Sequence, residues 1–309
     1  MPHFDEYGEH DEVSGTRHLT VGEGSWPTLW NYWAGFKDHY TADRQLGDLV
    51  AKQNPEIKRV AALRIAARTR LVRYMVAAAS VRQIIFVDCD MPTHDEGHEV
   101  AHRIDPDVRV LYSSGHPVVM LNACVLMPDC EYVEVPATDP TALLAGAAEV
   151  LDLAEPVGVL LLNTFDVLDV DTARHITRTF AAALAPGSHV GIAHLTAKPG
   201  PPTSDKPPIG PRLDALFTAR HMPPPVLRTP TEIAGLLDAW ELLDPGVVPL
   251  SQWRPEFLLH QLNTEPPGDI RLVVAAARKR PAVAFPMTPA HLRVPGQPDP
   301  SNTERSSCP

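Results

Sequence analysis

Titratable side chains gather directly after a short apolar run. The run from Ile84 to Val87 predicts a strand, and Asp88 and Asp90 follow it on one turn. His94 and His98 come next, and their spacing of four residues would place both on one face of a helix. Two carboxylates with a histidine pair could hold a divalent metal ion through mixed oxygen and nitrogen ligands. They could equally serve as general acid and base without a metal.

A purely structural role for these residues is an alternative. An Asp-rich turn in front of a helix often acts as an N-cap and as a partner of the helix dipole. The string from His94 to His98 also differs from the HExxH zinc motif, because Glu96 comes one position too late. The sequence therefore leaves metal binding, metal-free acid–base chemistry and a structural turn as three open interpretations.

The elements that must position these residues are short strands that alternate with helices. Such alternation is typical of a parallel sheet with helices on both faces. Ligands of such sheets bind at the carboxyl ends of the strands. Asn163, Asp166 and Asp169 follow the fourth run, which would be the neighbour of the first, and so would join Asp88 at this end. The five apolar runs are Ile84 to Val87, Val108 to Tyr112, Tyr132 to Val135, Val157 to Leu162 and His189 to His194.

The N-terminal part has helical spacing and many aromatic residues. Apolar residues between Ala42 and Ala79 predict two amphipathic helices, separated at Pro55. The arginines of the second helix predict a solvated polar face, with an oligomer contact as the alternative. The aromatic residues before the first helix either pack a helix on the domain or line a ligand pocket. The arginines are Arg59, Arg64, Arg68, Arg70 and Arg73, and the aromatic residues are Trp26, Trp30, Tyr32, Trp33, Phe36 and Tyr40.

Composition and charge limit the partners. The formal net charge of -11 argues against nucleic acid and anionic membranes, since both bind basic surfaces. No apolar stretch approaches the length that crosses a bilayer, and the four cysteines show neither a CxxC pair nor a secretory spacing. The N-terminus carries neither a basic segment nor an apolar run. We therefore expect a cytoplasmic protein whose partner is either a neutral or cationic small molecule or a protein, with homo-oligomer formation as a further expectation.

Proline-rich and polar segments predict the domain limits. Residues 1–25 and 286–309 lack hydrophobic periodicity and are expected to be disordered. Residues 26–80 are expected to form a helical cap, and residues 81–285 a Rossmann-like domain. The prolines within residues 198–228 predict an insertion beside the core, which is a candidate lid over a pocket.

Four segments carry a family signature. They are Asn31 to Arg44, Pro92-Thr93 with His98 to Ala101, Leu184 to Ser188, and Trp240 to Pro249 with Trp253 to Pro255. These segments resemble the S-adenosyl methyltransferases that are abundant in actinobacteria, and the resemblance extends from about Leu29 to Lys279.

The resemblance implies both a fold and a pocket. The fold is a doubly wound α/β domain with a mostly parallel, seven-stranded sheet of the class I methyltransferase type. Its last two strands, Glu241 to Leu250 and Ile270 to Ala276, would form an antiparallel edge. In this family the N-terminal signature caps the ligand pocket. Substrate contacts are therefore expected from Tyr32, Trp33, Lys37, Asp38, Arg44 and Asn163.

The positions that contact S-adenosylmethionine (SAM) in the resembled family carry different residues here. Family members end the first strand with an acid and a glycine-rich turn, because glycine lets the backbone approach the amino-acid part of SAM. Phe86 stands in place of the acid, and Asp88 and Asp90 stand in place of two glycines. The acid that binds the ribose corresponds to Ser114, and the acid that meets the adenine amino group corresponds to Pro136. Two aspartates would also repel the SAM carboxylate.

We therefore predict a methyltransferase-fold protein that has lost ordinary SAM-dependent methyl transfer. It would act on a small organic molecule in biosynthesis, as a cyclase, lyase or isomerase. In this hypothesis Asp88, Asp90, His94, His98 and Asp166 carry acid–base chemistry, and the first four of them could hold a divalent metal. One alternative is a SAM-dependent methyltransferase with an unusual binding mode. Another is a non-catalytic protein that supports a different enzyme.

Overall fold

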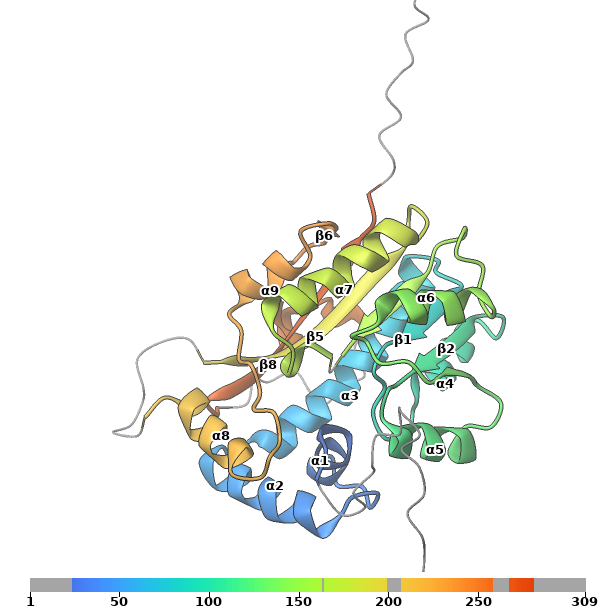
Figure 1. Cartoon of the computed structure of the whole chain (residues 1–309). Helices are drawn as coiled ribbons and strands as arrows, with labels where there is room; N and C mark the ends of the chain where they lie inside the picture. Colours follow the sequence, from blue (N-terminus) through green and yellow to red (C-terminus); the bar gives the residue numbers. More distant parts are fainter. Residues whose placement is uncertain (1–23, 163, 199–206, 258–266, 281–309) are drawn as a thin grey trace, which may run out of the picture.

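A mostly parallel sheet of eight strands forms the centre of the molecule (Figure 1). The computed structural model describes residues 24–162, 164–198, 207–257 and 267–280. The strands are β1 (Gln83–Phe86), β2 (Arg109–Ser113), β3 (Glu131–Val133), β4 (Gly158–Leu161), β5 (His189–Ala197), β6 (Glu241–Leu242), β7 (Val248–Pro249) and β8 (Ile270–Arg278). Their order is β3-β2-β1-β4-β5-β8-β6, and β7 pairs with β8.

The centre of the parallel part is β1. It pairs with β2 on one side and with β4 on the other, both in parallel. The strand order therefore reverses at β1, and the loops that follow β1 and β4 diverge there and leave room for a ligand. β5 continues the parallel part beside β4, and β8 runs antiparallel to β5. This topology confirms the predicted doubly wound α/β fold.

The number of strands differs from the prediction of seven. The segment predicted as one strand, from Glu241 to Leu250, contains two short strands that pair with different parts of β8. The turn between them includes Asp244, Pro245 and Gly246, and Gly246 has a φ of 86°, which favours glycine. Turn residues thus interrupt an apolar run that its periodicity alone did not divide.

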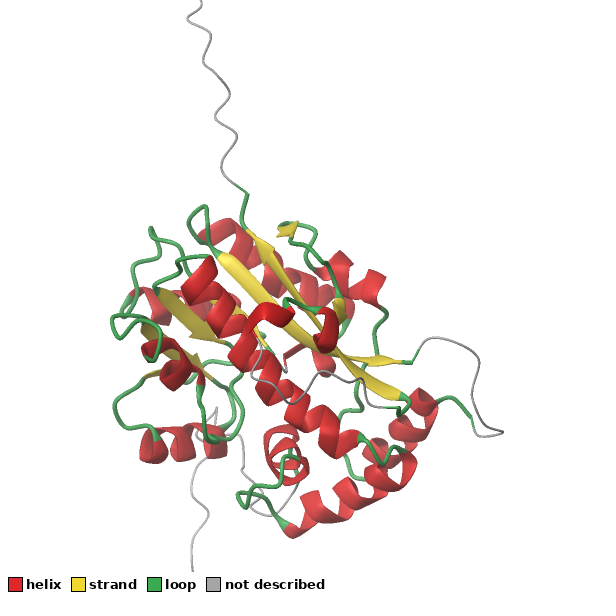
Figure 2. Ribbon diagram, turned by 180° about the vertical axis from the view of Figure 1, so that it is seen from behind, coloured by secondary structure: helices red, strands yellow, loops and turns green. Residues whose placement is uncertain are grey.

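Helices cover both faces of the sheet (Figures 1 and 2). Successive β1 residues alternate between the two layers: Ile84 and Phe86 contact the core on the side of α1 to α4 and α8, whereas Ile85 contacts the core under α6, α7 and α9. The helices are α1 (Trp26–Trp33), α2 (Thr41–Gln53), α3 (Ile57–Arg73), α4 (Gly97–His102), α5 (Pro117–Leu126), α6 (Pro140–Ala148), α7 (Val170–Ala183), α8 (Ile209–Thr218) and α9 (Pro230–Leu236). No helix in the described ranges is long and apolar enough to span a membrane.

Helices α1, α2 and α8 gather at one end of the sheet (Figure 1). Trp26 of α1 stacks on Phe217 of α8 at a centroid distance of 4.8 Å. Arg212 of α8 donates to Gln53 Oε1 at 2.9 Å. Helix α8 of the predicted insertion therefore packs on α1 and α2. Residues 199–206, and most of the ends predicted to be disordered, lie outside the described residues.

The arginine-rich helix α3 is buried on the side that was predicted to be solvated. Arg64, Arg68 and Arg70 are 5%, 8% and 1% exposed. Arg70 donates to the carbonyl groups of Leu250 and Trp253, and so connects α3 to the chain after β7. The solvated-face prediction was wrong for these three residues, because each guanidinium finds acceptors inside the fold.

Candidate functional site

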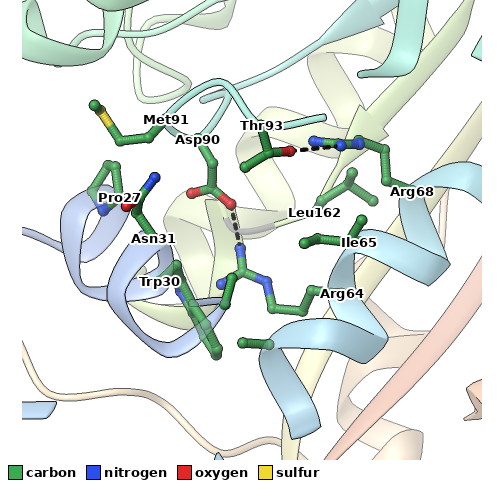
Figure 3. Close-up of a pocket in the computed structure, with 12 residues that line it drawn as sticks. Pro27, Trp30, Asn31, Arg64, Ile65, Arg68, Asp90, Met91, Thr93 and Leu162 are labelled. Atoms are coloured by element: carbon green, nitrogen blue, oxygen red, sulfur yellow. Dashed lines mark hydrogen bonds and ion pairs between the residues drawn. The ribbon is translucent and has the colours of Figure 1, made fainter. Parts of the chain in front are cut away.

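A pocket lies between α1, α3 and the loop that follows β1 (Figure 3). Each helix contributes one face, with residues at positions i, i+3, i+4 and i+7. Leu162, just after β4, closes the pocket on the side of the sheet. The lining residues are Pro27, Trp30, Asn31 and Ala34 near α1, Ala61, Arg64, Ile65 and Arg68 of α3, and Asp90, Met91 and Thr93 of the loop.

Arg64 is the cation of this pocket. Its Nη2 donates to Asp90 Oδ2 at 3.0 Å, and its guanidinium carbon lies 3.7 Å from the centroid of the Trp30 ring (Figure 3). Burial lowers the pKa of Arg64, and the nearby Asp90 carboxylate opposes that shift. Nη1 and Nε are buried and have no hydrogen-bond partner among the described residues. Arg64 therefore has donor capacity left for an anion.

Asn31 offers a second donor. Its side chain is 3% exposed, and Oδ1 accepts the backbone N–H of Asp38 at 2.9 Å. Nδ2 is buried without a partner among the described residues and points toward the loop that carries Met91 (Figure 3). Arg68 Nε of the same pocket is also buried without a partner among the described residues. Buried polar groups are normally paired, so the unpaired donors of Asn31, Arg64 and Arg68 indicate a site for an acceptor group.

Arg68 of α3 forms hydrogen bonds to the same loop. Its Nη1 donates to Glu96 Oε1 at 2.9 Å, and its Nη2 donates to Thr93 Oγ1 at 3.0 Å. Glu96 Oε1 also accepts the backbone N–H of Thr93 at 2.7 Å. Arg64 and Arg68 together offset the charges of Asp90 and Glu96. The aspartate-bearing loop is thus less repulsive to anions than its sequence implied.

Asp88 turns away from this pocket, toward the ends of β2 and β3. Its backbone has a φ of 48°, in the left-handed region that glycine adopts most easily and Asp tolerates. Ala137 N–H donates to Asp88 Oδ1 at 3.1 Å, and Gly115 N–H also donates to this carboxylate. Burial raises the pKa of Asp88 to about 6 against the pull of these two donors, and the neighbouring Asp90 raises it further.

The raised pKa predicts a pH-dependent effect of Asp88→Asn on stability. The folded protein keeps the Asp88 proton to higher pH than the unfolded chain, so the free energy of unfolding falls as the pH rises from about 4 through 6. Asn cannot ionise and avoids this loss. The variant should match the wild type near pH 4 and be more stable at pH 8, by about 3 kcal/mol at most. Urea unfolding at both pH values measures this difference, and an equal offset at both would contradict it.

Phe86 fills the space that an acid would occupy. Its ring stacks on Tyr112 at 4.8 Å with an interplanar angle of 16°. A Cβ atom added to Gly97 would lie 1.8 Å from the Phe86 ring, so only glycine fits there. The aromatic residue is therefore accommodated by the start of α4 and belongs to the core.

The two histidines of the predicted cluster separate. His94 is exposed and precedes α4, and its ring lies 5.2 Å from Phe36. His98 lies in α4, and its Nδ1 is 2.9 Å from the Tyr112 hydroxyl. Burial lowers the pKa of His98. Within the described ranges, no group of three or more His, Cys, Asp or Glu could hold a metal ion. The four residues predicted to be metal ligands do not form such a group.

Asp166 lies just after β4, in a buried network of hydrogen bonds with His194 and Arg228. It is 2% exposed, and Oδ1 accepts Leu195 N–H at 2.9 Å and lies 3.2 Å from His194 Nδ1. Arg228 Nη1 lies 2.9 Å from His194 Nε2, so that nitrogen accepts and Nδ1 carries the proton. Burial lowers the pKa of His194, which favours its neutral form. The contacts of Asp166 are thus with β5. They do not place it with Asp88 at the strand ends, as was predicted.

The predicted substrate contacts lie within the cap. Tyr32 donates to Asp48 Oδ1 at 2.5 Å, and Trp33 Nε1 donates to Gly47 O at 3.2 Å. None of the following lines the pocket: Tyr32, Trp33, Lys37, Asp38 and Arg44. Lys37, Asp38 and Arg44 are exposed, and Asn163 lies outside the described residues. The pocket uses neighbours of these residues, Trp30 and Asn31, from the same signature.

Comparison with known proteins identifies the family of the chain. The profile of the S-adenosyl methyltransferase family matches residues 15–280. The chain belongs to this family. No curated protein matches the chain. The structure is similar to that of a candidate methyltransferase from Thermobifida fusca, with 25% identity over 87% of this chain and 100% of that chain and a TM-score of 0.75. A DUF574 family protein from Streptomyces avermitilis is 27% identical over 84% of this chain and 98% of that chain, with a TM-score of 0.71.

The residues of this S-adenosyl methyltransferase family member fit the two ends of SAM unequally. Orphaned donors of Arg64 and Asn31 suit the α-carboxylate of its amino-acid part, and the carboxylate of Asp90 suits the α-ammonium. Ser114 and Pro136, at the positions where the resemblance implies contacts to adenosine, offer no carboxylate. The amino-acid end of the site therefore fits SAM, and the adenosine end is altered.

Proposed function

We propose that this protein is a SAM-dependent methyltransferase that holds the amino-acid part of SAM through side chains of α1 and α3. The observation that carries the proposal is that Arg64 and Asn31 have buried donors with no partner in the described part of the chain. These donors lie next to Asp90, at the carboxyl edge of β1 and β4. This is the edge at which open α/β sheets bind their ligands. The family of the chain supplies the reaction class.

Each residue has a separate task in this proposal. Arg64 and Asn31 bind the carboxylate, and Asp90, itself held by Arg64, binds the ammonium group. When bound, SAM supplies an electrophilic methyl group. Trp30, Met91 and Leu162 give the pocket apolar walls that exclude water and pack against the carbon chain of a ligand. We propose a small organic molecule as the methyl acceptor, because the net charge of -11 disfavours nucleic acid as a substrate.

Calorimetric titration of the protein with SAM and with S-adenosylhomocysteine tests the proposed function. We expect saturable binding of one ligand per chain, with a dissociation constant below about 1 mM, which corresponds to about 4 kcal/mol. No heat of binding for either ligand at millimolar concentration would reject a SAM-dependent activity.

A protein without SAM chemistry is the second candidate function. The observation that favours it is the adenosine end, where Asp88 occupies the donors of Gly115 and Ala137 and where Ser114 and Pro136 lack carboxylates. Such a protein would act on its small molecule as a cyclase, lyase or isomerase. The same titration decides between the two, because this candidate requires that neither SAM nor S-adenosylhomocysteine binds.

A further inference from the structure

We propose that Asp88 is a specificity-determining residue that competes with the adenosine part of a ligand for backbone donors at the ends of β2 and β3. The inference rests on the proposed function, since it concerns the other end of the same site. Its consequence is that the native chain binds adenosine-containing ligands more weakly than the same chain with glycine at this position.

The Asp88 carboxylate occupies backbone donors just after β2 and β3. Ala137 N–H lies 3.1 Å from Asp88 Oδ1, and Gly115 N–H donates to the same carboxylate. Gly115 directly follows Ser114, and Ala137 directly follows Pro136. These are the positions at which the resembled family contacts ribose and adenine. The ring nitrogens of adenine accept hydrogen bonds, so a ligand and the carboxylate need the same two N–H groups.

Little space is left between the loops that follow β2 and β3. A Cβ atom added to Gly115 would lie 2.6 Å from Pro136 Cβ, so the backbones after β2 and β3 approach closely there. Asp88 reaches this junction from the loop after β1 and is itself partly buried. A ligand atom that accepts from the Ala137 N–H would have to take the position of the Asp88 carboxylate oxygen, because both need the place next to this donor.

The charged groups near Asp88 leave its carboxylate to the backbone donors. Asp90 on the same loop repels it, whereas Arg64 and Arg68 of α3 are engaged with Asp90 and Glu96. Among the described residues, the hydrogen bonds to Asp88 come from the two backbone N–H groups alone. Those bonds are charge-assisted, and a ligand must replace them with neutral ones.

The backbone conformation makes a clean test available. Because φ is 48° at Asp88, glycine adopts this conformation with less strain than an L side chain. Asp88→Gly therefore keeps the loop and removes only the carboxylate. Asp88→Asn keeps the shape and an acceptor oxygen but removes the charge, and Asn also tolerates the left-handed region.

The experiment titrates the wild type and both variants with S-adenosylhomocysteine and with 5′-methylthioadenosine, which lacks the amino-acid end. Freeing two N–H groups should tighten binding of both ligands to Asp88→Gly by about tenfold or more. Asp88→Asn should give a smaller gain, because its amide oxygen still accepts but more weakly. Circular dichroism checks that each variant is folded, and Asp88→Asn carries the test if Asp88→Gly is not.

The outcomes separate this inference from the proposed function. Binding of S-adenosylhomocysteine to the wild type supports the proposed function whatever the variants do. Equal or weaker binding to Asp88→Gly and Asp88→Asn, with the wild type binding, overturns the role of Asp88 alone. If no protein of the series binds either ligand, both the proposed function and the role of Asp88 are rejected.

Discussion

Replacing Arg64 by Met is expected to weaken the binding of S-adenosylhomocysteine by about 10- to 100-fold. A hydrogen bond to a charged group contributes about 1.5 to 3 kcal/mol, and each 1.4 kcal/mol is a factor of ten in affinity. The substitution also removes the Arg64 guanidinium that lies 3.0 Å from Asp90, so the ligand carboxylate would then lie near a carboxylate that has lost this cation. Calorimetric titration of the folded variant measures the loss.

Two controls make the Arg64 experiment specific. Arg103→Met removes an arginine whose ion pair with Asp95 is exposed on both sides, at 54% and 53%, so ligand affinity should not change. Binding of 5′-methylthioadenosine to Asp88→Gly should be unchanged when Arg64→Met is added, because this ligand has no carboxylate. An equal loss for both ligands would mean that Arg64 supports the fold of the site and does not bind the carboxylate.

Replacing Arg228 by Met is expected to lower the free energy of unfolding by about 3 to 5 kcal/mol, the usual cost of removing one partner from a buried ionic group. Arg228 is 5% exposed and donates to His194 Nε2, to Phe165 O at 2.6 Å and to Leu168 O. The variant would leave His194 and the Asp166 carboxylate buried without this cation. In a domain of this size, the midpoint of thermal unfolding should fall by roughly 6 to 20 °C.

Arg178→Met is the matched control for the Arg228 variant. Arg178 pairs with Asp238 at 2.6 Å, but both side chains are exposed, at 59% and 39%, so no measurable change in stability is expected. A loss of less than about 1 kcal/mol for Arg228→Met would show that the buried network contributes little to the fold. Ligand affinity per folded molecule should be unchanged, because Arg228 does not line the pocket.

The fold was predictable from the sequence because its strands and helices follow hydrophobic periodicity. The five apolar runs correspond to β1 to β5 within a few residues, and Pro55 separates α2 from α3 as predicted. Periodicity did not predict the break between β6 and β7, where Pro245 and Gly246 form a turn inside an apolar run. Pro245 and Gly246 indicate a turn, but the apolar residues around them favoured a single strand.

The pocket was less predictable, because its charges are paired across long distances in the sequence. Arg64 and Arg68 share a helix face with Ala61 and Ile65, and that spacing alone indicates an inward face. Their partners lie 26 and 28 residues later, in a loop, so the sequence offered no sign that the charges are compensated. An arginine without a visible partner is normally predicted to be exposed.

The histidine cluster failed for a local reason. The i and i+4 rule requires both residues to lie in one helix, but α4 begins at Gly97, after His94. Glu96 takes the N-cap position, where its side chain also bonds to Thr93 and Arg68. The turn that Glu96 stabilises therefore separates His94 from His98, although their spacing predicted that they lie on one helix face.

A crystal structure of the protein with S-adenosylhomocysteine tests the central claim most directly. We predict that the ligand carboxylate lies within hydrogen-bond distance of Arg64 Nη1 and Asn31 Nδ2, two pocket donors that lack hydrogen-bond partners among the described residues. We also predict that the Asp88 carboxylate moves away from the N–H groups of Gly115 and Ala137. A ligand whose carboxylate contacts neither Arg64 nor Asn31, in a site where Asp88 keeps its contacts, would contradict the account.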